Sequence, residues 1–202
     1  MRAGVILAGG RSTRFGDADK AVADLAGTPM IRRVADRLVD AVDELVVNCR
    51  ADQRPAIAAA LDGYEHDVTF ALDPEPDRGP TAGIRTGLRA VDGEYAFVVA
   101  CDMPFVEPEL VDYLFERAAG HDVAIPRLDD YLQTMHAVYR ADAMAAACQD
   151  VLDGEGSGRV IDAFGSLDVV VLPADEVAAH GGVDSFENLN SRAEFEDAAA
   201  RL

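Results

Sequence analysis

The chemistry most visible in the sequence lies in a glycine-rich segment near the N-terminus, LAGGRSTRFGDADK, from Leu7 to Lys20. Gly9 and Gly10 allow a tight turn and let a ligand approach bare backbone N–H groups. The hydroxyl and cationic side chains that follow are Ser12, Thr13, Arg11, Arg14 and Lys20. Amides, hydroxyls and positive charge together predict a phosphate-binding loop. The segment has neither the GxxxxGK[ST] of a P-loop nor the GxGxxG of a dinucleotide-binding turn.

The charge distribution supports an anion site in this segment. Residues 1–20 carry four basic and two acidic side chains, whereas residues 21–202 carry 14 basic and 35 acidic ones. A positive segment within an otherwise strongly negative chain favours a local site for an anionic ligand over a basic surface.

Three further polar residues stand where predicted strands end. Asp102 comes just after the apolar run YAFVVA at 95–100, so its carboxylate is expected at the end of a buried strand. A carboxylate there suits Mg²⁺, which takes one or two protein carboxylates together with phosphate oxygens. The alternative is an N-cap of the next helix, which the two prolines that follow disfavour by delaying that helix. Asp73 and Asn48 also stand at strand ends, where each is alternatively a turn residue.

Short apolar runs alternate with helical patterns over the first 120 residues. The expected strands are Ala3–Leu7, Glu44–Cys49, Val68–Leu72, Tyr95–Ala100, Val123–Pro126, Gln133–Tyr139 and Val169–Leu172. The expected helices are Met30–Val42, Pro55–Leu61, Thr81–Ala90, Pro108–Ala119, Ala141–Leu152, Gly158–Phe164 and Ser191–Leu202. This alternation predicts an α/β fold with a mostly parallel sheet. Because ligands of such sheets bind beyond the carboxyl ends of the strands, the loops at 8–20, 73–80 and 101–105 are the predicted site.

Composition limits the class of protein. A chain of 202 residues, 50% of them hydrophobic, is expected to fold as one domain, 1–202. The 37 acidic residues against 18 basic ones, a net charge of −19, exclude binding to nucleic acid or an anionic membrane through a general basic surface. Lys20 is the single lysine, and the other 17 basic residues are arginines. An acidic surface nearly devoid of lysine predicts a salt-adapted source.

The sequence also predicts a cytoplasmic location. It contains no apolar run of about 18 residues, and its N-terminal apolar stretch enters the glycine-rich loop at once, unlike a signal peptide. The cysteines, Cys49, Cys101 and Cys148, are odd in number and form no CxxC. Neither a disulfide nor a zinc site is therefore expected.

The spacing L-A-G-G-x-S-x-R-x-G-x-x-x-K at 7–20 resembles the signature of the nucleoside triphosphate transferases. Within that superfamily the chain most resembles the molybdenum cofactor guanylyltransferases. Similar motifs extend along nearly all 202 residues: LAGTPM at 25–30, VVN at 46–48, Asp73 before GPTAG at 79–83, CDMPF at 101–105 and FENLNS at 186–191.

This resemblance implies a Rossmann-like three-layer α/β/α fold similar to the nucleotide-diphospho-sugar transferases. Residues 1–105 would form the nucleotide-binding part and residues 106–202 the acceptor-binding part. The implied reaction is transfer of GMP from GTP to the phosphate of molybdenum-molybdopterin, with release of pyrophosphate and with Mg²⁺ as cofactor. The implied nucleotide-binding residues are Leu7, Ala8, Gly9, Gly10, Lys20, Asn48, Asp73 and Asp102. The implied catalytic residues are Lys20, Arg14 and Asp102, with Asp102 binding the metal, and Asn188 and Asn190 are implied to contact the pterin.

Alternatives remain at this point. Sibling enzymes use a similar loop on other acceptors: the cytidylyltransferase for the same pterin, and guanylyltransferases for adenosylcobinamide phosphate or phospholactate. A GTP-binding regulator without catalysis is a different class, against which Lys20 and Asp102 argue. Molybdenum-inserting proteins and acceptor molybdoenzymes are the implied transient partners. Helix capping by Asn190 or Ser191 is the alternative for the C-terminal asparagines, and a lone strand histidine, His136, is more often structural.

Overall fold

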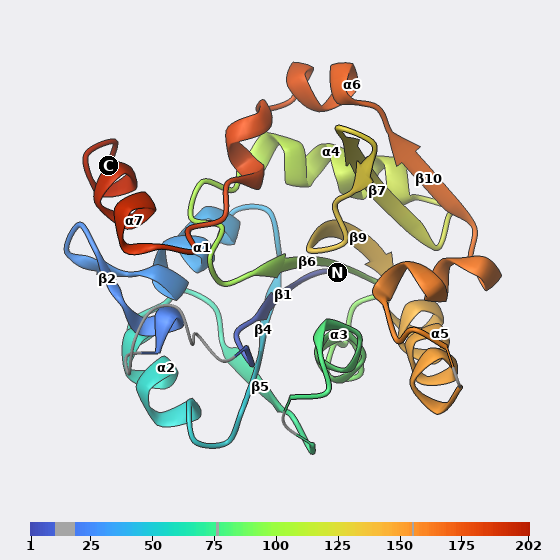
Figure 1. Ribbon diagram of the computed structural model, residues 1–202, viewed down its shortest axis with the longest axis horizontal. Helices are drawn as coiled ribbons and strands as arrows, with labels where there is room; N and C mark the ends of the chain where they lie inside the picture. The colour runs from blue at the N-terminus through green and yellow to red at the C-terminus, as the bar shows by residue number, and fades with distance from the viewer. Residues whose placement is uncertain (11–18, 76, 155) are drawn as a thin grey trace.

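The computed structural model of the protein describes residues 1–10, 19–75, 77–154 and 156–202. Within these ranges one sheet of eight strands runs through the molecule in the order β10-β7-β9-β6-β1-β4-β5, with β8 paired to β7 (Figure 1). Its strands are β1 (Arg2–Leu7), β4 (Glu44–Cys49), β5 (Val68–Leu72), β6 (Tyr95–Ala100), β7 (Val123–Leu128), β8 (Tyr131–Leu132), β9 (His136–Arg140) and β10 (Val169–Leu172). Neighbours pair in parallel except β9, which is antiparallel to β6 and β7, and β8, which is antiparallel to β7.

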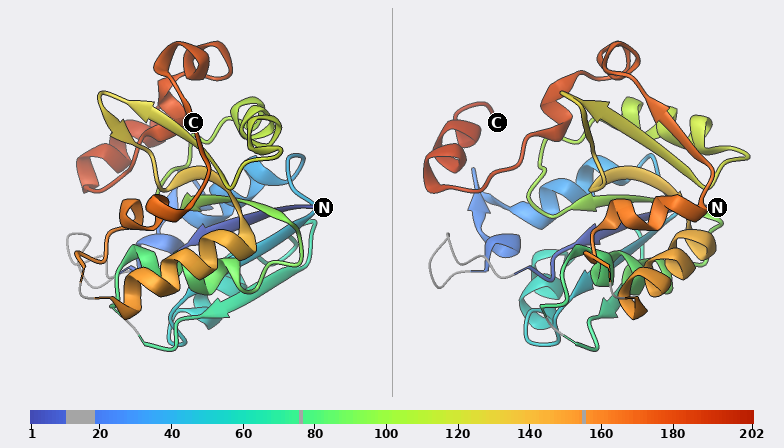
Figure 2. Two further views of the ribbon diagram at one scale, coloured as in Figure 1. Left: turned by 90° about the vertical axis from the view of Figure 1, so that its right-hand side faces the viewer. Right: turned by 45° about the vertical axis from the view of Figure 1, so that its right-hand side comes forward.

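Helices cover both faces of this sheet (Figure 2). One face carries α1 (Met30–Leu38), α2 (Arg54–Ala60), α4 (Pro108–Ala118) and α6 (Ala174–Ala179). The other carries α3 (Pro80–Leu88), α5 (Ala141–Asp153) and the 3₁₀ helix η2 (Val160–Ser166). The predicted three-layer α/β/α architecture is therefore confirmed. Among the described residues no helix combines the length and the apolar character needed to cross a bilayer.

The pleat of the strands divides the core in two. In β1, Ile6 belongs to the cluster on the face that carries α1, whereas Val5 and Leu7 belong to the cluster on the face that carries α3. The central strand β6 alternates in the same way. Because both faces of the sheet are covered, these strands are apolar at nearly every position, which explains why they stand out in the sequence as continuous apolar runs.

The register of the parallel strands aligns their carboxyl ends. Leu7 pairs with Asn48 on one side and with Ala100 on the other, and Cys49 pairs with Leu72. The segments that follow β1, β4, β5 and β6 therefore leave the sheet from one edge, as the sequence predicts.

Sequence patterns locate the buried strands more accurately than the ends of helices. The bounds predicted for β4, β5, β6 and β10 agree with the structure. Helix α1, however, ends at Leu38 and not at Val42, because the chain turns there and the N–H groups of Ala41 and Val42 both donate to the Leu38 carbonyl. Strand β9 begins at His136 because Gln133 starts a turn that His136 closes through its N–H.

Two further predicted helices differ from the structure in kind or in length. The segment predicted as a helix at 158–164 forms η2, with Asp162 accepting hydrogen bonds from the Ser157 hydroxyl and the Arg159 N–H. The closing helix is shorter than predicted, α7 (Arg192–Ala199). Ser191 is its N-cap, since the Ser191 hydroxyl accepts from the Glu194 N–H and the Glu194 carboxylate accepts from the Ser191 N–H.

Six short elements were not predicted: α6, β8, two 3₁₀ helices at Lys20–Val22 and Val183–Phe186, and β2 (Asp24–Leu25) and β3 (Thr28–Pro29), which pair as a hairpin. Ala26 and Gly27 join the hairpin with φ angles of 52° and 82°, as a two-residue hairpin turn with left-handed residues requires. Leu25 packs with Phe105 and with Phe195 of α7, which places the C-terminal helix beside the hairpin (Figure 1).

His136 lies wholly buried in β9 between aromatic rings. Its ring centroid is 4.9 Å from that of Phe97 and 4.3 Å from that of Phe186, and its Nε2 is 3.2 Å from the Ser185 hydroxyl. Burial lowers the pKa of His136 to about 3. The imidazole is therefore neutral at pH 7 and belongs to the core.

This burial predicts an acid-sensitive stability. Below pH 6.5 the unfolded chain binds a proton at His136 and the folded chain does not, so the free energy of unfolding falls by up to about 1.4 kcal/mol per pH unit from this group. We expect His136→Leu to remove that share of the slope. Urea unfolding of both chains at pH 7, 6 and 5, in one salt concentration, measures it; parallel curves for the two chains would contradict the prediction.

Candidate functional site

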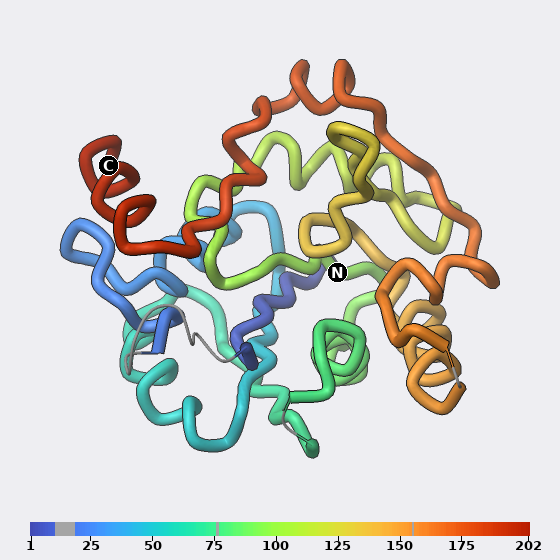
Figure 3. Tube along the Cα trace, in the orientation of Figure 1, coloured from blue at the N-terminus to red at the C-terminus, as the bar shows by residue number. Residues whose placement is uncertain are grey.

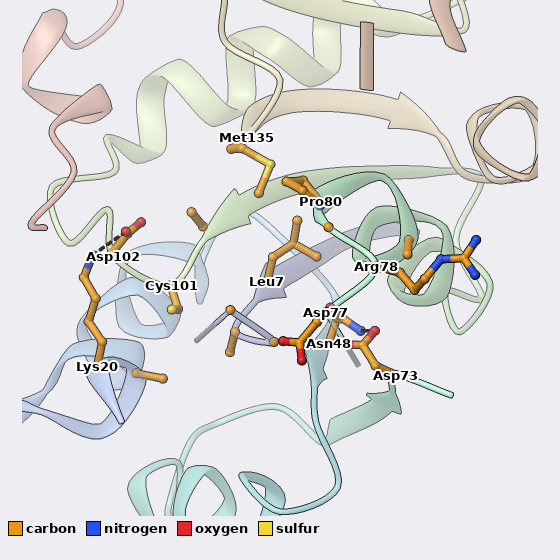
Figure 4. Close-up of a pocket in the computed structure, with 18 of the residues that line it drawn as sticks. Leu7, Lys20, Asn48, Asp73, Asp77, Arg78, Pro80, Cys101, Asp102 and Met135 are labelled. Carbon is orange, nitrogen blue, oxygen red and sulfur yellow. Dashed lines mark hydrogen bonds and ion pairs between the residues drawn. The ribbon is translucent and has the colours of Figure 1, made fainter. Parts of the chain in front are cut away.

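A cavity of about 580 Å³ opens at the carboxyl edge of the parallel strands, a volume in the range of small-molecule sites. Its walls come from the ends of β1, β4 and β6 and from the start of α3 (Figure 4). The eight residues predicted to bind a nucleotide all line it: Leu7, Ala8, Gly9, Gly10, Lys20, Asn48, Asp73 and Asp102. The structure therefore brings together residues from four segments that are far apart in the sequence, 7–20, Asn48, Asp73 and Asp102.

Lys20 and Asp102 face each other at one end of the cavity (Figure 4). The Lys20 ammonium lies 2.6 Å from Oδ2 of Asp102, and it also donates to Oδ1 of Asn190 at 2.9 Å. Lys20 is 8% exposed, and a buried cation of this kind needs such partners. The second carboxylate oxygen of Asp102, Oδ1, is buried and has no hydrogen-bond partner among the described residues. This end of the cavity thus offers a cation beside an unused anionic oxygen.

Asn48 and Asp73 form a second polar pair at the other end of the cavity (Figure 4). The Asn48 amide donates to Oδ1 of Asp73 at 2.7 Å and to the Ala71 carbonyl at 3.1 Å. Partial burial raises the pKa of Asp73, while the hydrogen bond from Asn48 and the charges of Arg50 and Arg85 oppose that rise. The pair is a preorganised set of acceptors.

Two glycines let the backbone approach this second pair closely. A Cβ on Gly9 would lie 2.5 Å from Oδ2 of Asp73, and one on Gly83 would lie 2.8 Å from Oδ1 of Asn48. Both distances are shorter than van der Waals contact, so a side chain at either position would displace the polar pair. The two glycine motifs therefore shape the cavity as well as the turns.

The C-terminal asparagines separate in the structure. Asn190 lines the cavity, and the N–H of the preceding Leu189 donates to the Asp102 carbonyl at 3.0 Å. The segment before α7 therefore passes beside the loop that follows β6 (Figure 3). Asn188 does not line the cavity, and its amide donates to the Phe186 carbonyl. The structure brings one of the two predicted acceptor residues to the site.

The predicted phosphate loop has five hydroxyl or cationic side chains, and four of them lie within 11–18, outside the described residues: Arg11, Ser12, Thr13 and Arg14. The cysteines are free, as expected, and burial raises the pKa of Cys101, which lines the cavity, well above its ordinary value. The thiol is thus protonated and not a nucleophile at neutral pH. Within the described ranges no three His, Cys, Asp or Glu side chains cluster to hold a metal, so a metal here would depend on ligand oxygens as well as protein.

Met135 and Arg78 line the cavity but were not singled out from the sequence. Arg78 falls in the loop at 73–80 that the sequence marks as part of the site. Met135 was not predicted to line the cavity because the sequence pattern predicts a strand from Gln133 onwards. In the structure Met135 lies in the turn before β9, and only a prediction of that turn would have indicated it.

A family model described as a MobA-like NTP transferase domain matches residues 4–179. The chain belongs to this family. A "probable molybdenum cofactor guanylyltransferase" from Natronomonas pharaonis is 52% identical, over 100% of this chain and 98% of the relative. One with the same name from Haloferax mediterranei is 47% identical, over 94% and 89%. The crystal structure of molybdopterin-guanine dinucleotide biosynthesis protein A from Archaeoglobus fulgidus is similar with a TM-score of 0.79 and 26% identity, over 100% and 98%.

Membership of the MobA-like NTP transferase family confirms the resemblance drawn from the motifs and the predicted class of fold. Both named relatives come from halophilic archaea, in agreement with the salt-adapted composition of this chain.

Proposed function

We propose that the protein transfers GMP from GTP to the terminal phosphate of molybdenum-molybdopterin and releases pyrophosphate. The observation that carries this proposal is the division of one cavity into two polar ends, Lys20 with Asp102 and Asn48 with Asp73, with Gly9 and Gly10 in the same wall. The end with Lys20 fits a triphosphate, and the end with hydrogen-bond acceptors fits a guanine base. The substrate that receives the GMP is proposed from the names of the relatives.

The acceptor end fits guanine by its hydrogen-bonding pattern. Guanine presents an N–H and an amino group on one edge, both of them donors. The carboxylate of Asp73 accepts from two neighbouring donors, and Asn48 holds that carboxylate in place. Adenine and cytosine present an acceptor on the corresponding edge, so they fit the pair less well.

The cationic end fits the phosphates and a divalent metal. Asp102 would hold Mg²⁺ through Oδ1, the buried oxygen without a partner, which matches the preference of this ion for one carboxylate plus phosphate oxygens. Bound Mg²⁺ would supply positive charge to the phosphates. Lys20 neutralises charge on the α-phosphate and on the departing pyrophosphate, and Arg14, with Arg11, is proposed to assist. The amides of Gly9 and Gly10 donate to phosphate oxygens.

The transfer needs positioning and charge stabilisation more than acid–base chemistry. An oxygen of the acceptor phosphate forms a bond to the α-phosphorus of GTP, and the bond from that phosphorus to the β-phosphate oxygen breaks. The electron pair leaves with pyrophosphate. The attacking oxygen is already anionic, so no general base is required. Asn190 accepts a hydrogen bond from Lys20 and lines the same cavity, which supports its assignment to the acceptor side.

The division of labour along the chain is part of the proposal. Residues 1–105 would supply the nucleotide site, and residues 106–202 would supply Asn190 and the acceptor side. Molybdenum-inserting proteins and acceptor molybdoenzymes are the proposed transient partners.

Pyrophosphate release tests the proposal directly. We expect release from GTP, but not from CTP or ATP, and only when molybdenum-molybdopterin and Mg²⁺ are present in high salt. A reaction with EDTA in place of Mg²⁺ is the control. Release with CTP in preference to GTP would assign a cytidylyltransferase, and GTP binding without release for any of the sibling acceptors would assign a regulator; either result overturns the proposal.

A further inference from the structure

The turn between β4 and α2 carries a buried glutamine that contacts both sides of the phosphate loop. Gln53 is 3% exposed. Its amide nitrogen donates to the Ala8 carbonyl at 2.9 Å and to Oδ2 of Asp19 at 2.8 Å. Its amide oxygen accepts from the Arg50 N–H at 3.0 Å. Ala8 precedes and Asp19 follows the loop residues in the chain, so one side chain joins the two.

Every hydrogen of the Gln53 amide is used in these contacts. The side chain has two donors and both have partners, and its oxygen has one. A buried amide is stable only when its hydrogen bonds are satisfied, and here the partners are the loop ends and the turn itself. Gln53 thus has a defined geometry that neither aspartate nor leucine at this position would reproduce.

Arg50, in the same turn, holds the glycine side of the loop. Its guanidinium donates to the carbonyls of Gly9 and Gly10 at 3.0 and 3.1 Å, and it pairs with Asp52 at 3.1 Å. Binding both carbonyls fixes the orientation of the peptide units at Gly9 and Gly10.

Asp19 connects Gln53 to the short helix that begins with Lys20. Its Oδ1 accepts from the Ala21 N–H at 3.1 Å and so caps the short 3₁₀ helix η1 (Lys20–Val22), while its Oδ2 is held by Gln53. Lys20 is the first residue of that helix, and its ammonium reaches Asp102. The Asp19 side chain therefore links Gln53 to the backbone at Lys20, and both of its carboxylate oxygens are held by hydrogen bonds.

We infer that Gln53 is a positioning residue for nucleotidyl transfer: it sets the end of β1 against Asp19 and, through Asp19, aims Lys20 at the phosphates. The inference rests on the proposed function for the identity of the ligand. It adds a residue that touches neither substrate nor metal, since Gln53 does not line the cavity.

A cycle of variants tests this inference. Gln53→Glu keeps the acceptor for Arg50 but replaces the donor with a carboxylate that faces Asp19. We expect kcat/KM for GTP to fall roughly 10- to 100-fold, the usual size for loss of a hydrogen bond to a charged group, while KM for the acceptor is unchanged. Gln149→Glu is the matched control, because Gln149 also donates to a carboxylate, that of Asp153 at 2.9 Å, on the outer helix α5.

The decisive comparison is made in the Lys20→Ala background. If Gln53 acts through Lys20, adding Gln53→Glu to Lys20→Ala changes kcat/KM by less than about threefold, because the two effects are not additive. A full, multiplicative loss in that background would overturn the inference, as would a Gln53→Glu enzyme equal to the Gln149→Glu control.

Asp19→Asn approaches the same contact from the other side if Gln53→Glu does not fold. It keeps the oxygen that caps η1 and turns a donor toward Gln53, so the same fall in kcat/KM is expected. Combining the two substitutions reverses donor and acceptor, and we expect activity to recover several-fold over Gln53→Glu alone. An Asp19→Asn enzyme with wild-type kinetics contradicts the inference.

Different results would reject the positioning role of Gln53 and the proposed function. A wild-type chain that releases no pyrophosphate removes the proposed function, and the same variants are then compared through the dissociation constant of GTP with Mg²⁺ by calorimetry. Non-additive losses of affinity support the positioning role there, and additive or absent losses overturn it. A normal wild-type rate with an unaffected Gln53→Glu enzyme removes only the positioning role.

Discussion

Lys20→Ala is expected to lower the rate of pyrophosphate release roughly 100-fold or more while the protein remains folded. The ammonium lines the cavity 2.6 Å from Asp102, at the end where we propose that the phosphates bind. Removing it takes away one of the positive charges that would neutralise the leaving pyrophosphate, and it leaves the Asp102 carboxylate without its ammonium partner. Steady-state kinetics with GTP and acceptor, together with thermal unfolding at the same salt concentration, measure both parts. An unchanged rate would remove Lys20 from the mechanism.

Lys20→Arg is the informative companion variant. It keeps the charge but replaces a compact ammonium with a planar guanidinium. The position is 8% exposed, and the ammonium fits between an oxygen of Asp102 and an oxygen of Asn190. We expect the larger group to recover little of the lost rate. Full activity of Lys20→Arg would mean that charge alone suffices and that the single lysine has no special role.

The burial of Lys20 also connects the composition to the site. Every other basic residue of the chain is an arginine, and the chain is strongly acidic. We attribute this composition to the solvent-exposed surface. The one lysine that remains is buried and paired inside the cavity. We propose that the geometry of the cavity, and not the surface, accounts for its retention, which the Lys20→Arg variant tests.

Much of the site was accessible from the sequence because it depends on strand ends. Buried parallel strands are continuous apolar runs, and a polar residue that follows such a run is placed at the carboxyl edge by topology alone. Asp102 was found in this way, whereas Asp73 and Asn48 were assigned to the site through the resemblance to the family. The pairing of Lys20 with Asp102 agrees with that placement, although the sequence gives no distance.

The remaining contacts depend on packing between distant segments. Asn190 reaches Lys20 across 170 residues because α7 packs on the β2–β3 hairpin, which no periodic pattern revealed. Gln53 lies in a turn whose sequence, RADQ, resembles any polar loop. The role that we infer for it rests on its burial and its three hydrogen-bond partners, which the sequence does not show. Short 3₁₀ segments such as η2 were misassigned because their pattern matches one turn of an α-helix.

Asp102→Asn is expected to lower the rate of transfer by roughly 100-fold or more and to raise the Mg²⁺ concentration needed for half-maximal activity. The substitution keeps the shape of the side chain and an oxygen toward Lys20. It removes the negative charge and, with it, the ability of Oδ1 to hold a divalent cation. Titration of Mg²⁺ in the kinetic assay measures the shift, and Mn²⁺ binding in the presence of GTP, followed by electron paramagnetic resonance, measures the site without turnover.

Asp112→Asn is the matched control. Asp112 is an exposed residue of helix α4 that forms an ion pair with Arg2, and it does not line the cavity. It should leave both titrations unchanged. The comparison with Lys20→Ala separates two explanations of a slow Asp102→Asn enzyme. If Asp102 only holds Lys20 in place, the two variants together are no slower than the slower one, and Mn²⁺ binding is normal. If Asp102 binds the metal, Mn²⁺ affinity falls in Asp102→Asn but not in Lys20→Ala. Normal Mn²⁺ affinity in Asp102→Asn would therefore reassign this carboxylate from metal ligand to counter-ion of the lysine.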